Sequence, residues 1–189
     1  MSVIDQILES GSIGVIPTDT VYGVVAKASD HIAVKRLYDL KKREDKPGTL
    51  IAANIEQLQE LGLKHRYLKA VEQFWPGAVS IIIPSSDPNL AYIHRGKMSM
   101  AVRIPSDKNL QTILKQTGPL LTSSANPPGE PTATTIQQAK DYFGDKVDFY
   151  EDGGDLSGRQ SSTIIRIIDD AIEVIRPGAV KIDDATISP

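Results

Sequence analysis

Short runs of apolar and β-branched residues alternate along this chain with longer stretches in which apolar residues recur every three or four positions. The first pattern predicts buried strands, and the second predicts amphipathic helices. Strands are expected at 13–17, 50–53, 79–83, 98–104, 119–122, 147–150, 163–168 and 173–175. Strands and helices that alternate in this way are typical of an α/β fold.

Polar capping residues and glycines place the ends of the helices. Asp30, Asn54 and Asp107 each precede a helical stretch and can accept hydrogen bonds from its first turn, whereas Gly62 and Gly144 can end one. Helices are therefore expected at 31–40, 55–61, 65–75 and 108–114, with a further helix ending at 143. The last two strands form a hairpin across 169–170, so the sheet is expected to be mixed. We expect a single domain over residues 1–182 and a flexible tail at 183–189.

Composition excludes several classes of protein. The chain has 189 residues, no cysteine and three histidines far apart in the sequence, so we expect no disulfide, cysteine nucleophile or bound metal site. A net charge of -3 argues against a protein that coats nucleic acid. The same net charge is compatible with a local basic patch. No apolar run approaches the ~20 residues of a membrane span, and the N-terminus lacks a basic signal region. We expect a cytoplasmic protein with no membrane partner.

Two polar segments in the first half of the chain suit ligand binding. In PTDTVYG, at 17–23, Thr18 and Thr20 flank Asp19 directly after a strand, where ligands of open α/β sheets bind. An ordinary turn stabilised by these side chains would explain the same residues. KKREDK, at 41–46, places four cations at a helix end. The helix dipole favours cations there, and the same cations can grip a polyphosphate.

Polar loops in the second half add further candidates. The loop 122–135 is rich in hydroxyls, and Ser124 and Asn126 lie two residues apart, so on an extended chain they face the same side and can bind a phosphate or ribose. A loop of this length is more often functional than merely connecting. DGG at 152–154 allows close approach of the backbone to a ligand. These residues suit an anionic, phosphate-bearing ligand but do not identify a reaction.

Arg103 lies in the strand expected at 98–104. The even-numbered residues of this strand are apolar, so Ser99, Ala101 and Arg103 share the opposite face. A buried, unpaired arginine is costly. Arg103 is therefore expected to face either bulk water or a cavity in which it meets an anion.

Taken together and in order, these segments resemble the YrdC-like family, specifically its threonylcarbamoyl-AMP synthases of the short, single-domain form. The motifs are PTDTVYG at 17–23, K-x-R at 41–43, WPG at 75–77, SMAVRIP at 99–105, SAN at 124–126, DGG at 152–154, SSTI at 161–164 and RPG at 176–178. The resemblance implies a twisted, mixed, open sheet with flanking helices around a large basic cavity.

The resemblance also implies a nucleotidyltransferase that makes threonylcarbamoyl-AMP and pyrophosphate from L-threonine, bicarbonate and ATP, with Mg²⁺ on the ATP. A separate tRNA threonylcarbamoyl transferase would use this product to modify tRNA. By the same resemblance, Lys41 and Arg43 look like a catalytic phosphate clamp that also binds ATP. Thr20, Arg103 and Ser162 look like the threonine site, and Ser99, Ser124, Asn126, Thr134 and Arg176 look like further ATP contacts.

The chain departs from the family pattern at a few positions. Glu44 follows Arg43 where the family has proline, which puts the contribution of Lys46 in question, and Ala53 stands where longer members carry histidine. Two other interpretations stay open. One is an RNA-binding module of the same fold without catalysis, which would contact RNA or tRNA. The other is a paralogue that handles another carbamoyl adenylate, as in hydrogenase maturation proteins.

Overall fold

One mixed sheet organises the chain over residues 1–42, 46–169 and 171–182, which the computed structural model describes. Within these ranges the strand order is β7-β1-β2-β6-β3-β5-β4-β8-β9. The strands are β1 (Ile13–Pro17), β2 (Tyr22–Lys27), β3 (Thr49–Ile51), β4 (Val79–Pro84), β5 (Ser99–Arg103), β6 (Leu120–Ser124), β7 (Phe149–Tyr150), β8 (Thr163–Ile168) and β9 (Ala171–Arg176). The pairs β1–β7, β3–β5 and β4–β8 are parallel and the other neighbours are antiparallel, which confirms the mixed α/β prediction.

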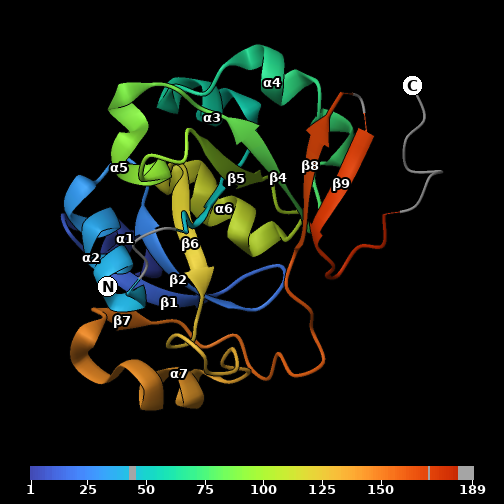
Figure 1. Ribbon diagram of the computed structural model, residues 1–189. Coiled ribbons are helices and arrows are strands. Elements are labelled where there is room, and N and C mark those ends of the chain that lie inside the picture. The colour runs from blue at the N-terminus through green and yellow to red at the C-terminus, as the bar shows by residue number, and fades with distance from the viewer. Residues whose placement is uncertain (43–45, 170, 183–189) are drawn as a thin grey trace.

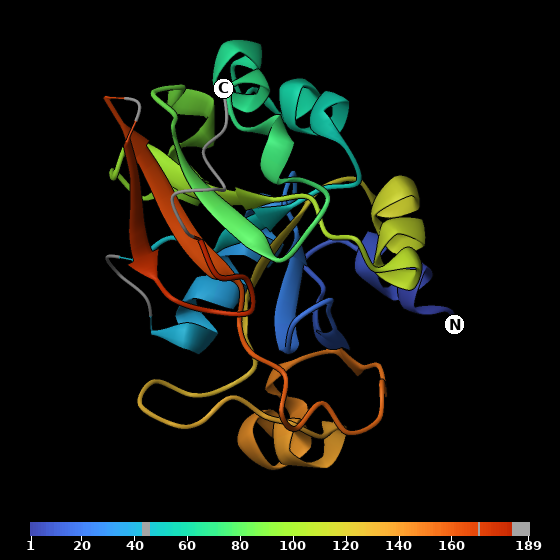
Figure 2. The same ribbon diagram turned by 90° about the vertical axis from the view of Figure 1, so that its right-hand side faces the viewer.

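Helices cover both faces of this sheet (Figures 1 and 2). They are α1 (Val3–Leu8), α2 (His31–Lys41), α3 (Ile55–Leu61), α4 (His65–Lys69), α5 (Ala91–His94), α6 (Lys108–Thr117) and α7 (Ile136–Phe143), with short 3-10 turns η1 (Glu72–Phe74), η2 (Pro88–Leu90) and η3 (Gly144–Lys146). Apolar residues of α1 and α6 pack with Ile16 and Val25 in one core cluster, whereas α2 and α7 pack with Val15 and Val24 in another. Neighbouring residues of a strand thus enter different cores, because side chains alternate between the faces.

The expected caps form where the sequence places them. Asp30 accepts hydrogen bonds from the backbone N–H groups of Ile32 at 2.9 Å and Ala33 at 3.0 Å, and its other oxygen accepts from Gly11 at 2.7 Å. Asn54 and Asp107 cap α3 and α6 in the same manner. One side chain thereby fixes the start of α2 and ties it to the turn before β1.

Two sequence expectations about elements were wrong or incomplete. β2 was not expected, because Tyr22–Lys27 shows no alternation, and the structure places it in the interior of the sheet with both faces covered. The helix expected at 65–75 ends at Lys69, and η1 follows. Trp75 precedes a proline, which favours extended backbone, and it has φ -122° and ψ 152°. Val71 and Phe74 meanwhile pack against β4 and β8.

Two further expectations concern the ends and the surroundings of the chain. The expected tail at 183–189 lies outside the described residues. Among the described helices, none has the length and the apolar character that crossing a membrane requires.

Candidate functional site

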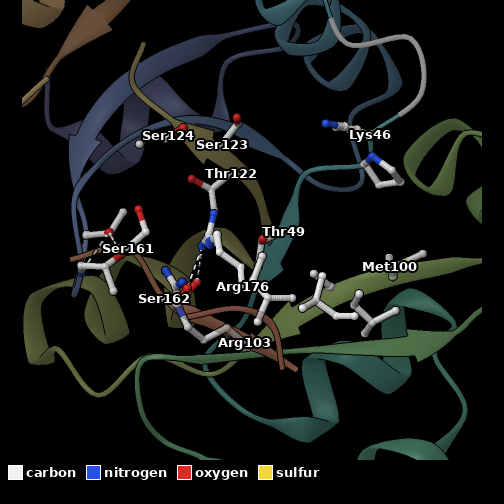
Figure 3. A pocket seen from close by; sticks show the side chains of 18 of the residues that line it. Lys46, Thr49, Met100, Arg103, Thr122, Ser123, Ser124, Ser161, Ser162 and Arg176 are labelled. Atoms are coloured by element: carbon white, nitrogen blue, oxygen red, sulfur yellow. Dashed lines mark hydrogen bonds between the residues drawn. The ribbon is translucent and has the colours of Figure 1, made fainter. Parts of the chain in front are cut away.

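A cavity of ≈ 430 Å³ is lined by residues of several strands of the sheet and of the loops beside them (Figure 3). Its walls come from β2, β3, β4, β5, β6, β8 and β9, together with the loop after β1 and the segments before β3, β5 and β8. The lining includes the expected site residues Thr20, Ser99, Arg103, Ser124, Ser162 and Arg176. The fold therefore brings together residues that lie up to 156 positions apart in the sequence, the span from Thr20 to Arg176 (176 - 20).

The remaining expected residues lie elsewhere or outside the described ranges. Asn126 is not part of the lining, and its amide nitrogen donates to the carbonyl oxygens of Pro127 at 3.1 Å and Glu130 at 2.8 Å. Thr134 is likewise absent from the lining, and its hydroxyl contacts Gln138 at 3.1 Å. Arg43 falls within residues 43–45, outside the described residues. Their assignment to ATP stays a prediction.

Lys41 is buried and holds the loop that follows β6. Its ammonium donates to the backbone oxygen of Ser124 at 2.6 Å, to the backbone oxygen of Asn126, and to the side-chain oxygen of Asn126 at 3.3 Å. Lys41 does not line the cavity, whereas the exposed Lys46 and Lys97 do. Lys46 therefore lies at the site in spite of the altered spacing at 44–47. Of the cations near the end of α2, Lys41 holds the loop after β6 and Lys46 lines the cavity.

Arg103 lines the cavity and is paired with Asp19. The Arg103 Nη2 atom lies 3.0 Å from Asp19 Oδ1, and the two side chains are 4% and 5% exposed. Burial raises the pKa of the Asp19 carboxyl, and the Arg103 charge opposes that rise. Burial lowers the pKa of Arg103, and Asp19 opposes that fall. The sequence had left Arg103 two partners, water or a ligand anion, and the structure adds a protein carboxylate as a third.

The pair still has unused hydrogen-bonding capacity. Asp19 Oδ2 and Arg103 Nε are buried and have no hydrogen-bond partner among the described residues. Buried polar atoms in this state are rare in folded proteins and point to strain, a missing water or a functional role. Arg103 lines the cavity, so its unpaired Nε marks this end of the cavity as the place where a polar ligand group would gain a hydrogen bond.

A chain of hydrogen bonds continues from Arg103 under the cavity. Arg103 Nη1 donates to Ser80 Oγ at 3.4 Å, and Ser80 Oγ lies 2.9 Å from Ser162 Oγ. Arg176 Nη2 donates to Ser162 Oγ at 3.2 Å and to the Ser162 carbonyl oxygen at 2.7 Å, as the dashed lines of Figure 3 show. Sequence reasoning missed Ser80, because a single serine within an apolar strand gives no local signal of a role.

Two glycines allow close approach of backbone around the cavity. A Cβ atom on Gly23 would lie 2.6 Å from the Thr122 hydroxyl, inside the lining. A Cβ atom on Gly178 would lie 2.3 Å from the Ser161 carbonyl oxygen, and the next residue, Ala179, donates its N–H to that oxygen at 2.9 Å. The glycine of RPG therefore holds the end of β9 against the Ser161–Ser162 wall.

The described lining carries hydroxyls and cations but no carboxylate. Across the described residues, no group of three or more His, Cys, Asp or Glu side chains is placed to hold a metal ion. Mg²⁺ prefers carboxylate and phosphate oxygens. The residues at the cavity therefore do not fit a magnesium ion held by the protein itself, whereas they do fit an anionic ligand.

Comparison with known proteins gives a match over nearly the whole chain. The family model Sua5_yciO_yrdC, described as "Telomere recombination", matches residues 6–178. The threonylcarbamoyl-AMP synthase of Pseudomonas aeruginosa strain UCBPP-PA14 is 33% identical over 175 residues, which cover 91% of this chain and 94% of that protein. The threonylcarbamoyl-AMP synthase of Pyrococcus abyssi is 31% identical over 182 residues, which cover 94% of this chain and 53% of that protein. The chain thus spans about half the length of this longer relative.

Solved structures share the fold. The crystal structure of P. abyssi Sua5 complexed with L-threonine matches with a TM-score of 0.81 and 31% identity, over 93% of this chain and 52% of that one. E. coli YciO matches with a TM-score of 0.80 over 94% of this chain and 88% of that one, and at 22% identity it supports the fold alone.

Proposed function

This chain belongs to the Sua5/YciO/YrdC family, and we propose that it makes threonylcarbamoyl-AMP from L-threonine, bicarbonate and ATP. The observation that carries the proposal is the composition of the cavity. The guanidinium groups of Arg103 and Arg176 lie at one end beside Ser162, while Lys46 lies on the opposite side (Figure 3). Further hydroxyls, such as those of Thr122 and Ser124, line the rest of the cavity. An amino-acid carboxylate and a polyphosphate are the two anions that such a lining would hold together.

The proposed reaction needs little covalent chemistry from the protein. The threonine amine adds to the carbon of bicarbonate, and loss of water gives a carbamate. A carbamate oxygen then attacks the α-phosphorus of ATP, the bond from that phosphorus to the bridging oxygen breaks, and pyrophosphate leaves. The carbamate is already an anionic nucleophile, so no strong general base is needed. Catalysis of this kind rests on positioning and on electrostatic stabilisation.

We assign the amino acid to the end of the cavity at Arg103. An arginine fork matches a carboxylate in geometry and charge, and Thr20 and Ser162 add hydroxyls to the same lining. The nucleotide would occupy the remainder, near Ser99, Ser124 and Arg176. Lys46 and Lys97 would meet the departing pyrophosphate as point charges. Arg43, outside the described residues, stays the predicted partner of this clamp.

Magnesium enters this proposal as part of the substrate. Because no carboxylate lines the described cavity, Mg²⁺ would arrive bound to the phosphates of ATP, and no step is assigned to a metal ion held by the chain. The product is a mixed anhydride of a carbamate and a phosphate. It has to be consumed by a group-transfer enzyme, which we propose is the tRNA threonylcarbamoyl transferase. We likewise propose that the reaction takes place in the cytoplasm.

The test is pyrophosphate release measured with each substrate omitted in turn. The synthase requires L-threonine, bicarbonate and ATP together. A paralogue that handles another carbamoyl adenylate would release pyrophosphate without L-threonine when given its own acyl donor. An RNA-binding module would release none under any combination. Identification of threonylcarbamoyl-AMP by mass spectrometry completes the assignment, and its absence in the full mixture overturns it.

A further inference from the structure

Ser80 is fully buried in β4 and does not line the cavity, yet it touches two residues that do. Its side chain is 0% exposed. Its hydroxyl oxygen lies 3.4 Å from Arg103 Nη1 and 2.9 Å from Ser162 Oγ. Ser80 is thus the link between the guanidinium and the serine at one end of the cavity.

The chemistry of these groups fixes which atom donates to which. A guanidinium only donates, so Ser80 Oγ accepts from Arg103. The hydrogen of the Ser80 hydroxyl then has Ser162 Oγ as the acceptor that the described residues offer. If Ser162 donated to Ser80 instead, the Ser80 hydrogen would stay buried without an acceptor, which is costly. The favoured arrangement therefore has Ser80 donating to Ser162.

This direction determines what Ser162 offers to a ligand. Ser162 Oγ accepts from Ser80 and also from Arg176 Nη2 at 3.2 Å. A hydroxyl oxygen has two lone pairs, so both are used. The hydrogen of Ser162 is left to point away from the protein partners, and Ser162 lines the cavity.

We propose that Ser80 is a positioning residue that sets the Ser162 hydroxyl as a hydrogen-bond donor to an oxygen of the bound amino-acid substrate. This inference rests on the proposed function, because that function places the amino acid at this end of the cavity. Arg103 and Ser162 then present donors from two sides to an anionic oxygen of the carboxylate or carbamate. An amine, which needs an acceptor, is disfavoured at the same place.

The sharpest test compares Ser80→Thr with Ser80→Val. The two new side chains have nearly the same shape, but threonine keeps the hydroxyl. We expect Ser80→Val to raise the KM for L-threonine roughly fivefold, the size of one hydrogen bond, with the KM for ATP and kcat within twofold of wild type. Ser80→Thr should stay near wild type. If the pair does not fold, Ser80→Ala gives the same comparison with a smaller side chain. Equal threonine KM values for the valine and threonine variants, or for Ser80→Ala and wild type, overturn the proposal.

Two controls separate positioning from general damage. Ser12 is also buried, and its hydroxyl has no hydrogen-bond partner in the described chain, so Ser12→Ala should leave every kinetic constant unchanged. In a variant that already carries Ser162→Ala, adding Ser80→Ala should change the KM for L-threonine less than twofold, because Ser80 acts on the substrate through Ser162. If the KM of the double variant rises by the product of the two single effects, Ser80 does not act through Ser162 and the proposal fails.

A binding measurement keeps this inference distinct from the proposed function. Calorimetry measures the Kd for L-threonine without turnover. The ratio of the Kd values of Ser80→Val and Ser80→Thr then replaces the ratio of their KM values. If the wild type binds L-threonine but makes no threonylcarbamoyl-AMP, the proposed function fails while the contrast still tests Ser80. If the wild type turns over and the contrast is absent, the Ser80 proposal alone fails. If L-threonine neither binds nor reacts, both fail.

Discussion

Asp19 and Arg103 form a buried ion pair in which each residue has a polar atom that the pairing leaves unsatisfied. The Nη2–Oδ1 distance is 3.0 Å, and Asp19 Oδ2 and Arg103 Nε have no partner among the described residues. Asp19 lies in the loop between β1 and β2, and Arg103 is the last residue of β5. In the sheet, β2, β6 and β3 lie between β1 and β5. The pair therefore joins the loop after β1 to the end of β5, and Asp19 holds the Arg103 guanidinium in place at the cavity wall without a bound ligand.

Removing one member of this pair should cost more than removing both charges. Arg103→Gln leaves the Asp19 carboxylate buried without its counter-charge, and we expect a loss of about 3–5 kcal/mol in the free energy of unfolding. The double variant Asp19→Asn/Arg103→Gln should recover a substantial part of that loss. Urea unfolding of the wild type, both single variants and the double variant measures the coupling. Additive losses would show that the two charges do not stabilise each other.

The same pair predicts a pH dependence of stability. Burial raises the pKa of Asp19 in the folded protein, with Arg103 opposing the rise, so the folded state holds the proton more tightly than the unfolded chain does. The contribution of Asp19 is therefore largest below its unfolded pKa and is lost as the pH rises through the folded pKa. In Arg103→Gln the opposing charge is gone, so the pKa of Asp19 should rise further and the total loss of stability should be larger. Unfolding midpoints measured from below the ordinary carboxyl pKa upward through neutral pH check the sign. Addition of Asp19→Asn should flatten the curve, and a curve that stays steep would assign the effect to another group.

The absence of a side chain at Gly23 should matter to the cavity. A Cβ atom there would lie 2.6 Å from Thr122 Oγ1 and 3.3 Å from Thr18 Cγ2, so Gly23→Ala forces the lining apart. We expect a loss of about 1–3 kcal/mol in stability, typical of overpacking, and weaker ligand binding. Gly77→Ala is a matched control, because its new Cβ atom would meet its nearest neighbour at 3.4 Å, an ordinary contact distance. Equal effects of the two substitutions would contradict the steric argument.

The sequence predicted local structure best where one residue decides it. Asp30, Asn54 and Asp107 each cap a helix as expected, since a cap depends on two or three neighbouring residues. β2 was missed because a strand buried on both faces has no alternating pattern to detect. The helix expected at 65–75 was interrupted by long-range packing of Val71 and Phe74, which no local pattern encodes.

The candidate site divides in the same way. Residues in recognisable motifs, such as Thr20, Arg103 and Ser162, converge on the cavity. Their partners Asp19 and Ser80 could not be assigned, because a partner is defined by proximity in the folded chain. Lys41 was predicted to bind phosphate, and that stays a prediction, whereas its bonds to the loop after β6 depend on how that loop packs and could not be predicted from the sequence. The motifs therefore identified residues of the cavity, whereas their burial and their hydrogen-bond partners could be known only from the structure.

Lys41 should hold the loop after β6 even when no nucleotide is bound. Its ammonium donates to the backbone oxygens of Ser124 and Asn126, and it is buried. Lys41→Met keeps the length of the side chain but removes its donors. We expect faster amide hydrogen exchange at 124–134 in the ligand-free variant, together with weaker ATP binding. Lys42→Met, a change at an exposed neighbour, is the control. If exchange in the ligand-free protein is unchanged and only ATP affinity falls, Lys41 acts on phosphate directly and not through the loop.

Selection among amino acids should depend on the hydroxyl more than on the methyl group. Thr18 donates its hydroxyl hydrogen to the Val21 carbonyl oxygen at 2.6 Å, so in its contact with Thr20 at 3.1 Å the Thr20 hydroxyl is the donor. Thr20 lines the cavity with oxygen lone pairs that can accept from a substrate hydroxyl. L-serine keeps that hydroxyl and loses one methyl group, so its kcat/KM should fall by about 10–200-fold, whereas L-valine leaves a buried acceptor unpaired and should fall further. Threonine-dependent pyrophosphate release, repeated with each amino acid at saturating ATP and bicarbonate, measures the ratios. In the Thr20→Val variant, the kcat/KM values for L-serine and L-valine should differ by less than in the wild type. A wild type that uses valine as well as serine would mean that the substrate hydroxyl is not recognised at Thr20.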